Sequence, residues 1–176
     1  NCLSVGSVDL NGNLGIYSSR GPTSDGRIKP DILGVGTNAI SADSRMDAED
    51  GYCGEYKQTG TSQATPNVAG TLAVLRQYLT EGYYPTGEKV PANAIKNPSA
   101  ALMKAMLING AEPAYYLKDD PPKNTMFPLG AVPSVYQGWG IARLDKTLPV
   151  KGNFKMEIWD RVKIGSGEEL ETMLDF

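Results

Sequence analysis

The sequence predicts a protein of the α/β class, because short β-prone runs between glycine-rich turns precede two apolar helical segments. Residues 3–8 (LSVGSV) form the first β-prone run. Residues 32–33 and 39–40 are brief strand candidates on either side of the turn Gly34-Val35-Gly36. We therefore expect a small sheet with helices packed against it.

The first helix is expected to begin near Ser62 and to end at Gly82. Thr61 or Ser62 can cap its N-terminus, and Pro66 falls within about its first turn, where a missing N–H is tolerated. One face repeats apolar residues at helical spacing, namely Val68, Leu72, Leu75 and Leu79. This spacing predicts a helix with one buried side.

A second helix is expected from Pro98 through Asn109, with Asn97 as its cap and Gly110 beyond its end. Its apolar residues lie on nearly all sides, which predicts a largely buried helix. Residues 18–31 and the proline-rich residues 112–133 are expected to form loops.

The character of the chain changes near residue 150. Phe154, Met156 and Ile158 alternate with charged residues, and residues 162–164 continue a strand-like pattern. We therefore expect one domain over residues 1–150 and the start of a separate β-module over residues 151–176.

Composition excludes several classes of function. The 176 residues carry a formal net charge of −3, and their 17 Lys and Arg are scattered, so a nucleic-acid partner is not expected. No uninterrupted apolar run is long enough to cross a bilayer. Because the chain begins without Met or a signal-type stretch, we expect it to be a fragment of a longer product.

The chain has two cysteines and no histidine, so a structural zinc site would have too few ligands. From the residues alone, Cys2 and Cys53 are equally consistent with two buried thiols and with one disulfide.

The segment most suggestive of chemistry is Gly60-Thr61-Ser62, a tight turn that leads into the first helix. Unpaired N–H groups and the positive end of the helix dipole would stabilise an oxyanion there, and Gly60 permits close approach of a substrate. A serine nucleophile also needs a base, which is commonly a histidine or a lysine. By local physics alone, the Thr-Ser pair is favoured as a simple helix cap.

Residues 60–70 (GTSQATPNVAG) closely resemble the serine signature of the subtilases, the subtilisin-like serine proteases. Four other segments resemble further parts of that family in the right order: LSVGSVD, SSRGPTSDGRIKPDI, NPSAALMKAMLINGA and QGWGIARLDKTL. The resemblance covers residues 1–148. It implies the C-terminal part of a subtilisin-like parallel-sheet fold with helices on both faces, and the closest likeness is to members with a following β-sandwich or jelly-roll.

The resemblance implies that Ser62 is the nucleophile. Its own N–H and Thr61 would help to hold the oxyanion, with Gly60 in contact with substrate, while the Asp, the His and the oxyanion Asn would lie upstream of this chain. Asn1 is not assigned to that role. Three residues depart from the family pattern: Gln63, Asn67 and Val35.

The resemblance implies no cofactor for the chemistry, although subtilases often bind a structural calcium ion. Asp25 lies in a loop that supplies a ligand in some members, but a turn-forming role before Gly26 is favoured, so no metal ligand is assigned. Asp31 is likewise expected to be structural. Resemblance to secreted enzymes implies a secreted or lumenal protein and a Cys2–Cys53 disulfide.

Three functions follow as hypotheses. The first is a serine endopeptidase that cleaves polypeptides through an acyl-enzyme on Ser62, together with an upstream portion carrying Asp and His. The second is an inactive protease-like fold used for binding or structural assembly, suggested by the missing histidine and the three departures. The third is an unrelated α/β module in which Thr61-Ser62 only caps a helix.

Overall fold

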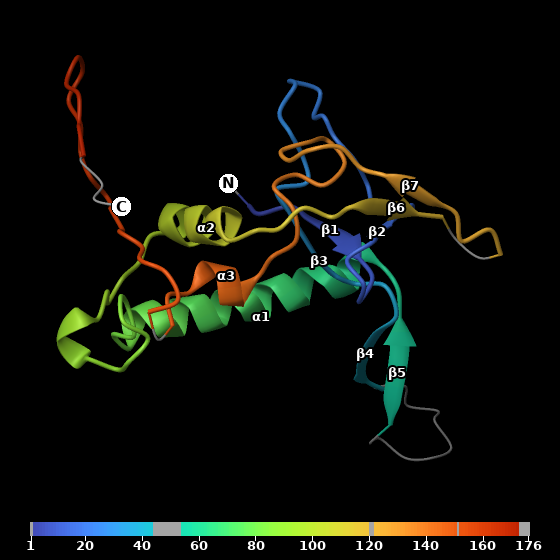
Figure 1. Ribbon diagram of the computed structural model, residues 1–176, viewed down its shortest axis with the longest axis horizontal. Helices are drawn as coiled ribbons and strands as arrows, with labels where there is room; N and C mark the ends of the chain where they lie inside the picture. The colour runs from blue at the N-terminus through green and yellow to red at the C-terminus, as the bar shows by residue number, and fades with distance from the viewer. Residues whose placement is uncertain (1, 44–53, 120–121, 151, 173–176) are drawn as a thin grey trace.

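The computed structural model describes residues 2–43, 54–119, 122–150 and 152–172. Its main sheet has five strands in the order β3-β1-β2-β6-β7 (Figure 1). At one side of this sheet, β1 (Val5–Val8) runs parallel to β3 (Ile32–Val35). The predicted α/β class is therefore confirmed.

Strand β2 (Leu14–Gly15) pairs antiparallel with β1 at Val8 and parallel with β6 (Tyr116–Lys118). Strand β6 then forms a hairpin with β7 (Met126–Pro128). The prediction that residues 112–133 are wholly irregular is thus wrong. Proline has no backbone N–H to donate to a neighbouring strand. It is compatible with this hairpin because β7 is an edge strand, where the loss of one such donor costs little.

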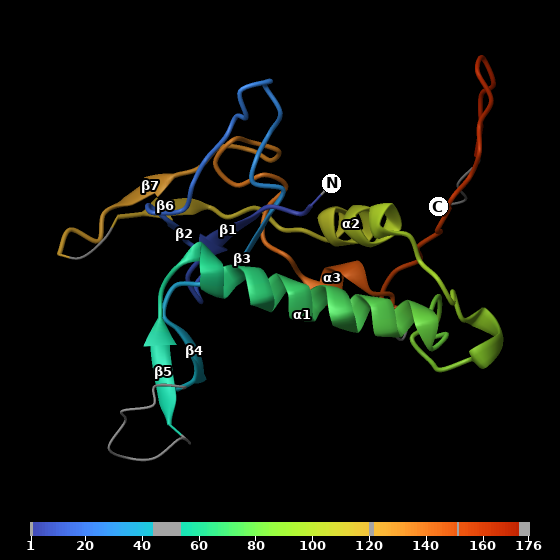
Figure 2. The same cartoon turned by 180° about the vertical axis from the view of Figure 1, so that it is seen from behind.

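Strands β4 (Ala39–Ala42) and β5 (Glu55–Gln58) form a second, two-stranded sheet. Both views show this pair projecting away from the main sheet (Figures 1 and 2). The side chains of β5 are all exposed, and the strand leads directly into the first helix.

Helix α1 spans Thr61–Thr80, close to the predicted range. Its N-cap is Gly60, and no side chain caps it, so the prediction that Thr61 or Ser62 is the cap is wrong. Both residues already belong to the first helical turn, whereas a capping side chain must come from the non-helical residue before it. The Ser62 hydroxyl is therefore not used as a cap.

Helix α2 spans Ala100–Asn109, and its cap is Ser99 rather than the predicted Asn97. The Ser99 hydroxyl accepts the N–H of Leu102 at 3.0 Å, which satisfies one of the unpaired amides of the first turn. The helix is buried along one side only, at Leu102, Met106 and Leu107. Its other side lies at the surface. Two short helical turns complete the chain, η1 (Pro91–Asn93) and α3 (Leu144–Thr147).

The two faces of the parallel strands are covered differently. Ile32 packs against Val68 of α1 and Leu107 of α2. Its neighbour Leu33 points the other way, into a cluster with Val8, Leu14 and Ala114. Among the described elements, both long helices therefore lie on one face of the sheet, and residues from the 112–141 region cover the other face.

The C-terminal residues do not form the predicted strands. Residues 152–172 contain no strand, although the alternation of apolar and charged residues predicted several. Met156 and Ile158 instead pack against the cluster that joins α1 and α2, which includes Leu79 and Leu102. The apolar side of the alternation is thus partly buried against the helices, without a partner strand. The domain boundary at residue 150 stays a prediction.

Polar contacts attach this segment to the helices as far as residue 161. The Tyr84 hydroxyl donates to the carbonyl of Met156 at 2.8 Å, and the Ser99 N–H donates to the Asp160 carboxylate at 2.8 Å. The Arg161 guanidinium donates to the carbonyl of Asn97 at 3.2 Å. Residues 161–172 are exposed throughout.

We predict that trypsin cleaves after Lys163 well before it cleaves after Lys155. Lys155 precedes the segment held by Tyr84, whereas Lys163 lies in exposed chain, and local opening governs such cleavage. Mass spectrometry of a limited digest measures the order. Tyr84→Phe should speed cleavage after Lys155 alone. Equal initial rates of cleavage after Lys155 and Lys163 in the unaltered protein would contradict the prediction.

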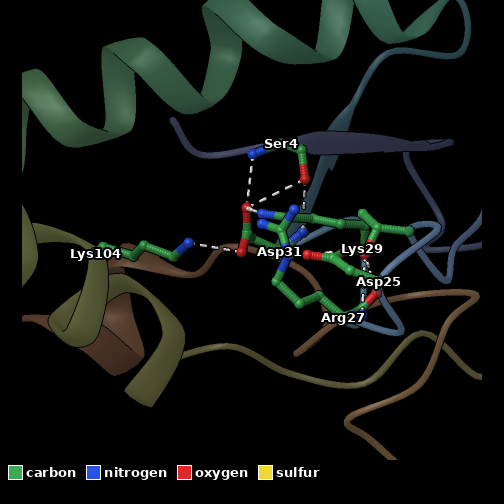
Figure 3. A network of polar contacts seen from close by, with 7 residues as sticks. Ser4, Asp25, Arg27, Lys29, Asp31 and Lys104 are labelled. Carbon is green, nitrogen blue, oxygen red and sulfur yellow. Dashed lines mark hydrogen bonds and ion pairs between the residues drawn. The ribbon is translucent and has the colours of Figure 1, made fainter. Parts of the chain in front are cut away.

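A buried carboxylate joins three parts of the fold (Figure 3). Asp31 precedes β3, and its side chain is only 9% exposed. It accepts the N–H of Ser4 at 2.8 Å and ion-pairs with Lys29 at 2.5 Å and with Lys104 of α2 at 2.6 Å. The expected structural role of Asp31 is confirmed, and the contact with Lys104 extends that role to α2.

These contacts favour the ionised form of the Asp31 carboxyl group. Burial opposes ionisation, but the hydrogen bonds from Lys104, Lys29 and Ser4 outweigh it and lower the pKa of Asp31 from 3.8 to about 2. Because the folded pKa lies below the unfolded one, the stabilisation is complete above about pH 4 and is lost as the pH falls through 2.

We predict that this one group removes about 2 kcal/mol from the free energy of unfolding between pH 5 and pH 2. Urea unfolding at a series of pH values measures the effect. Asp31→Asn should abolish this part of the pH dependence. The matched control is Asp25→Asn, since Asp25 forms an exposed ion pair with Arg27. An equal change in the pH dependence of the free energy of unfolding in both variants would contradict the prediction.

Candidate active site

Ser62 is the second residue of α1. Figure 2 shows the chain passing from the end of β5 to the start of this helix. It is exposed, and its hydroxyl has no hydrogen-bond partner among the described residues. The carbonyl of Gly60 accepts the amides of Gln63 and Ala64, at 3.2 and 3.3 Å. In the described part of the chain, the amides of Thr61 and Ser62 have no backbone acceptor, as expected for the first turn of a helix.

This arrangement offers an accessible hydroxyl beside two unpaired N–H groups at the positive end of a 20-residue helix. Such a site can stabilise a negative oxygen that forms next to the serine. No basic side chain bonds to the Ser62 hydroxyl within the described ranges, and the sequence contains no histidine. The described residues thus supply features that would stabilise an oxyanion, without a base bonded to the serine.

Close packing of α1 on β3 fixes the position of this turn. The Gly60 N–H donates to the carbonyl of Gly36 at 2.9 Å. A Cβ added at Gly36 would lie 2.4 Å from the Gly60 carbonyl oxygen, and one added at Gly34 would lie 2.6 Å from Val68. The two glycines of the Gly34-Val35-Gly36 turn thus allow the helix to contact the strand, and no larger residue fits there without movement.

Two of the three departures from the subtilase pattern, Gln63 and Asn67, make side-chain hydrogen bonds that sequence reasoning missed, whereas Val35 takes part only through its backbone carbonyl. Asn67 donates through its side-chain amide to the carbonyl of Val35 at 3.0 Å, so two of these positions contact each other. The side-chain amide of Gln63 donates to Gln58 of β5. Both bonds tie the first turns of α1 to the strands around it. Their signal in the sequence is weak, because Asn and Gln are common exposed residues.

A chain of three hydroxyls lies behind the turn and was also missed by the sequence analysis. Ser7 of β1 contacts Tyr17 at 2.7 Å, and Tyr17 contacts Thr37 at 2.6 Å. Gly36 packs on this chain, since a Cβ there would lie 2.5 Å from the Ser7 oxygen. These residues are far apart in sequence, so only the fold brings them together.

Asp25, for which the sequence favours a turn-forming role, lies in such a turn. Asp25 accepts hydrogen bonds from Thr23 and Arg27 within a tight turn whose Gly26 has a φ of +84°. These bonds lower the pKa of Asp25, with the bond from Thr23 making the largest contribution. The Asp25 carboxylate is thus bonded within its own turn, in agreement with the favoured turn-forming role, and a structural calcium ion stays a prediction.

Within the described ranges, no group of three or more acidic, Cys or His residues could hold a metal ion. Cys2 is an exposed free cysteine in the structure, whereas Cys53 lies outside the described residues, so the predicted disulfide is not seen and stays a prediction. None of the described helices has the length and hydrophobicity needed to cross a membrane.

Comparison with known proteins agrees with this geometry. The model of the Subtilase family matches residues 1–140. The chain is 37% identical over 155 residues to the serine protease/ABC transporter B family protein tagB of Dictyostelium discoideum, covering 80% of this chain and 8% of that protein. It is 44% identical over 62 residues to the minor extracellular protease Vpr of Bacillus subtilis, covering 35% of this chain and 8% of Vpr.

Among solved structures, the CspB protease of Clostridium perfringens matches with a TM-score of 0.54 and 29% identity, over 84% of this chain and 26% of that one. The fold of this chain is thus similar to part of a known protease structure. The chain belongs to the subtilase family of serine proteases. It spans 8% of the length of the curated relatives tagB and Vpr.

We predict opposite effects of alanine at two glycines near this site. Gly36→Ala should destabilise the protein by about 1–3 kcal/mol, because the new methyl group overlaps the Gly60 backbone. Gly70→Ala should stabilise it by about 0.5–1 kcal/mol, because Gly70 lies on the exposed side of α1 with nothing within 4 Å. Urea unfolding measures both changes, and a neutral Gly36→Ala would show that the turn is not tightly packed.

Proposed function

We propose that Ser62 is the nucleophile of a serine endopeptidase, and that it cleaves polypeptides through an acyl-enzyme. The observation that carries this proposal is the free, exposed hydroxyl at the start of α1, which caps no helix and has no partner among the described residues. A serine kept for capping would have its oxygen on a backbone amide. Membership of the subtilase family supports the same role.

In this mechanism the Ser62 oxygen attacks the scissile carbonyl, whose oxygen becomes negative. The amide of Ser62 and the neighbouring Thr61 help to hold that oxygen, with the helix dipole adding to their effect. Gly60 lies beside the incoming substrate. When the negative intermediate collapses, the C–N bond breaks and the amine leaves with the proton that the base took from Ser62. Water then hydrolyses the ester formed on Ser62, which releases the acid and restores the serine hydroxyl.

The other catalytic groups come from sequence upstream of Asn1. Ser62 needs a histidine to take its proton, and this sequence has none. We propose that the upstream part of the enzyme supplies the Asp and His of the triad and the oxyanion Asn. The much greater length of the relatives tagB and Vpr is consistent with this division.

We further propose that the enzyme acts outside the cell or in a lumenal compartment. One relative, Vpr, is named a minor extracellular protease. An oxidising compartment of that kind would also permit the Cys2–Cys53 disulfide.

We predict that a fluorophosphonate probe labels Ser62 in the full-length product and does not label the 176-residue chain alone. Removing the base leaves only a residual rate, because the members of a triad act as a unit. Labelling is measured by mass spectrometry of the modified peptide, with Ser62→Ala as the control. A correctly folded full-length product that does not react would favour an inactive protease-like protein, as the missing histidine also suggests.

A further inference from the structure

A broad pocket of about 620 Å³ lies between α2 and the end of the described chain. A second pocket of about 300 Å³ shares with it two residues of α2 and Trp159, so the two pockets form one continuous surface. We call it the Trp159 surface. Its apolar residues are Ala101, Leu102, Ala105, Trp159, Val162 and Leu170.

Large apolar side chains on this surface are open to water. The exposed residues before Trp159, which are Lys155 and Glu157, are charged. Trp159 is 49% exposed, and Val162 and Leu170 are 48% and 55% exposed. Exposed apolar side chains that gather around a hollow are typical of a surface that another segment or protein covers.

The charged groups of the Trp159 surface already have partners. The Asp160 carboxylate accepts the N–H of Ser99 at 2.8 Å and lies 4.0 Å from the guanidinium of Arg161. Arg161 also donates to the carbonyl of Asn97 at 3.2 Å. Sites for small ligands usually present a few convergent polar groups that are free to bind. The paired charges therefore favour an occupant that packs apolar protein side chains against Trp159.

The end of the described chain returns to this surface. Both views show it extending away from the helices and then doubling back (Figures 1 and 2). The turn is closed by the Glu168 N–H, which donates to the carbonyl of Gly165 at 3.1 Å. Beyond the turn, Leu170 and Thr172 line the larger pocket. Chain that continues after Phe176 therefore starts within a few residues of the surface, where tethering gives it an effective concentration of about millimolar.

The two arms of this excursion are incomplete as β-structure. Within residues 161–172, the bond that closes the turn is the one backbone–backbone hydrogen bond that the structure describes, so no ladder joins the arms. The sequence nevertheless alternates apolar and charged residues up to Ile164, as strands do. A two-stranded hairpin is marginally stable by itself and needs further strands or a helix to pack on.

We propose that the chain following Phe176 in the full-length product continues as β-strands and packs its apolar side chains on the Trp159 surface. The β-module expected after residue 150 is then held against α2 and does not move independently of it. The greater length of the relatives tagB and Vpr, of which this chain spans 8% each, is consistent with such a product. This inference goes beyond the proposed peptidase function and does not depend on it.

The test compares the two tryptophans of this chain in the folded full-length product. Hydroxyl-radical footprinting read by mass spectrometry gives a separate oxidation rate for Trp159 and for Trp139, which is similarly exposed at 43%. Trp159 should be oxidised about fivefold more slowly than Trp139, because the core of a packed interface excludes water. Equal rates would overturn the proposal.

A matched pair of variants shows that the protection comes from this surface. Leu170→Asp should raise the oxidation rate of Trp159 to near that of Trp139, because a charge opposes apolar packing. Leu10→Asp is the control, since Leu10 is 79% exposed and lies outside both pockets, and it should change neither rate. Continued protection of Trp159 in a folded Leu170→Asp variant would overturn the proposal. Thermal unfolding checks the fold of both variants.

Photocrosslinking in the full-length product identifies the occupant without disrupting the surface. A benzophenone amino acid at position Val162 should form adducts with peptides from the sequence after Phe176, as mapped by mass spectrometry. Adducts with sequence upstream of Asn1 would overturn the proposal. Adducts that join labelled to unlabelled chains, in a mixture of isotope-labelled and unlabelled protein, would also overturn it, because the occupant would then be a second copy.

Discussion

The close contact between the first turn of α1 and the end of β3 is the constraint on which the rest of the structure depends. Gly34 and Gly36 remove the side chains that would separate the two elements, and the Gly36 carbonyl holds the Gly60 amide. The helix start is therefore fixed to the sheet by backbone, with little freedom to shift. A nucleophile benefits from such rigidity, because small displacements from a reactive geometry are costly.

The same contact organises the polar residues around it. Asn67 and Gln63 add side-chain bonds from α1 to the neighbouring strands, while Ser7, Tyr17 and Thr37 fill the space behind Gly36. Two positions that differ from the usual subtilase pattern, Gln63 and Asn67, thus support the turn and leave Ser62 exposed.

The Asp31 network plays a corresponding role at the other end of β3. One carboxylate connects the residue before β1, the loop before β3 and α2 through Ser4, Lys29 and Lys104 (Figure 3). Buried charges are stable only when they are paired, so this network favours a single arrangement of the three segments. Together with the glycine contact, it positions both ends of the strand that α1 packs against.

The sequence by itself determined the α/β class, the extent of α1, the family and the candidate nucleophile, because helical spacing and the GTSQATPNVAG segment are local patterns. It did not determine the cap of α1, the β6–β7 hairpin or the course of residues 152–172, which depend on partners distant along the chain. The alternation of apolar and charged residues after Phe154 indicated that one side of this segment packs against the protein. Only the tertiary structure shows that this side packs against helices. The bonds from Asn67 to Val35 and from Lys104 to Asp31 span 32 and 73 residues, so no local rule could have predicted them.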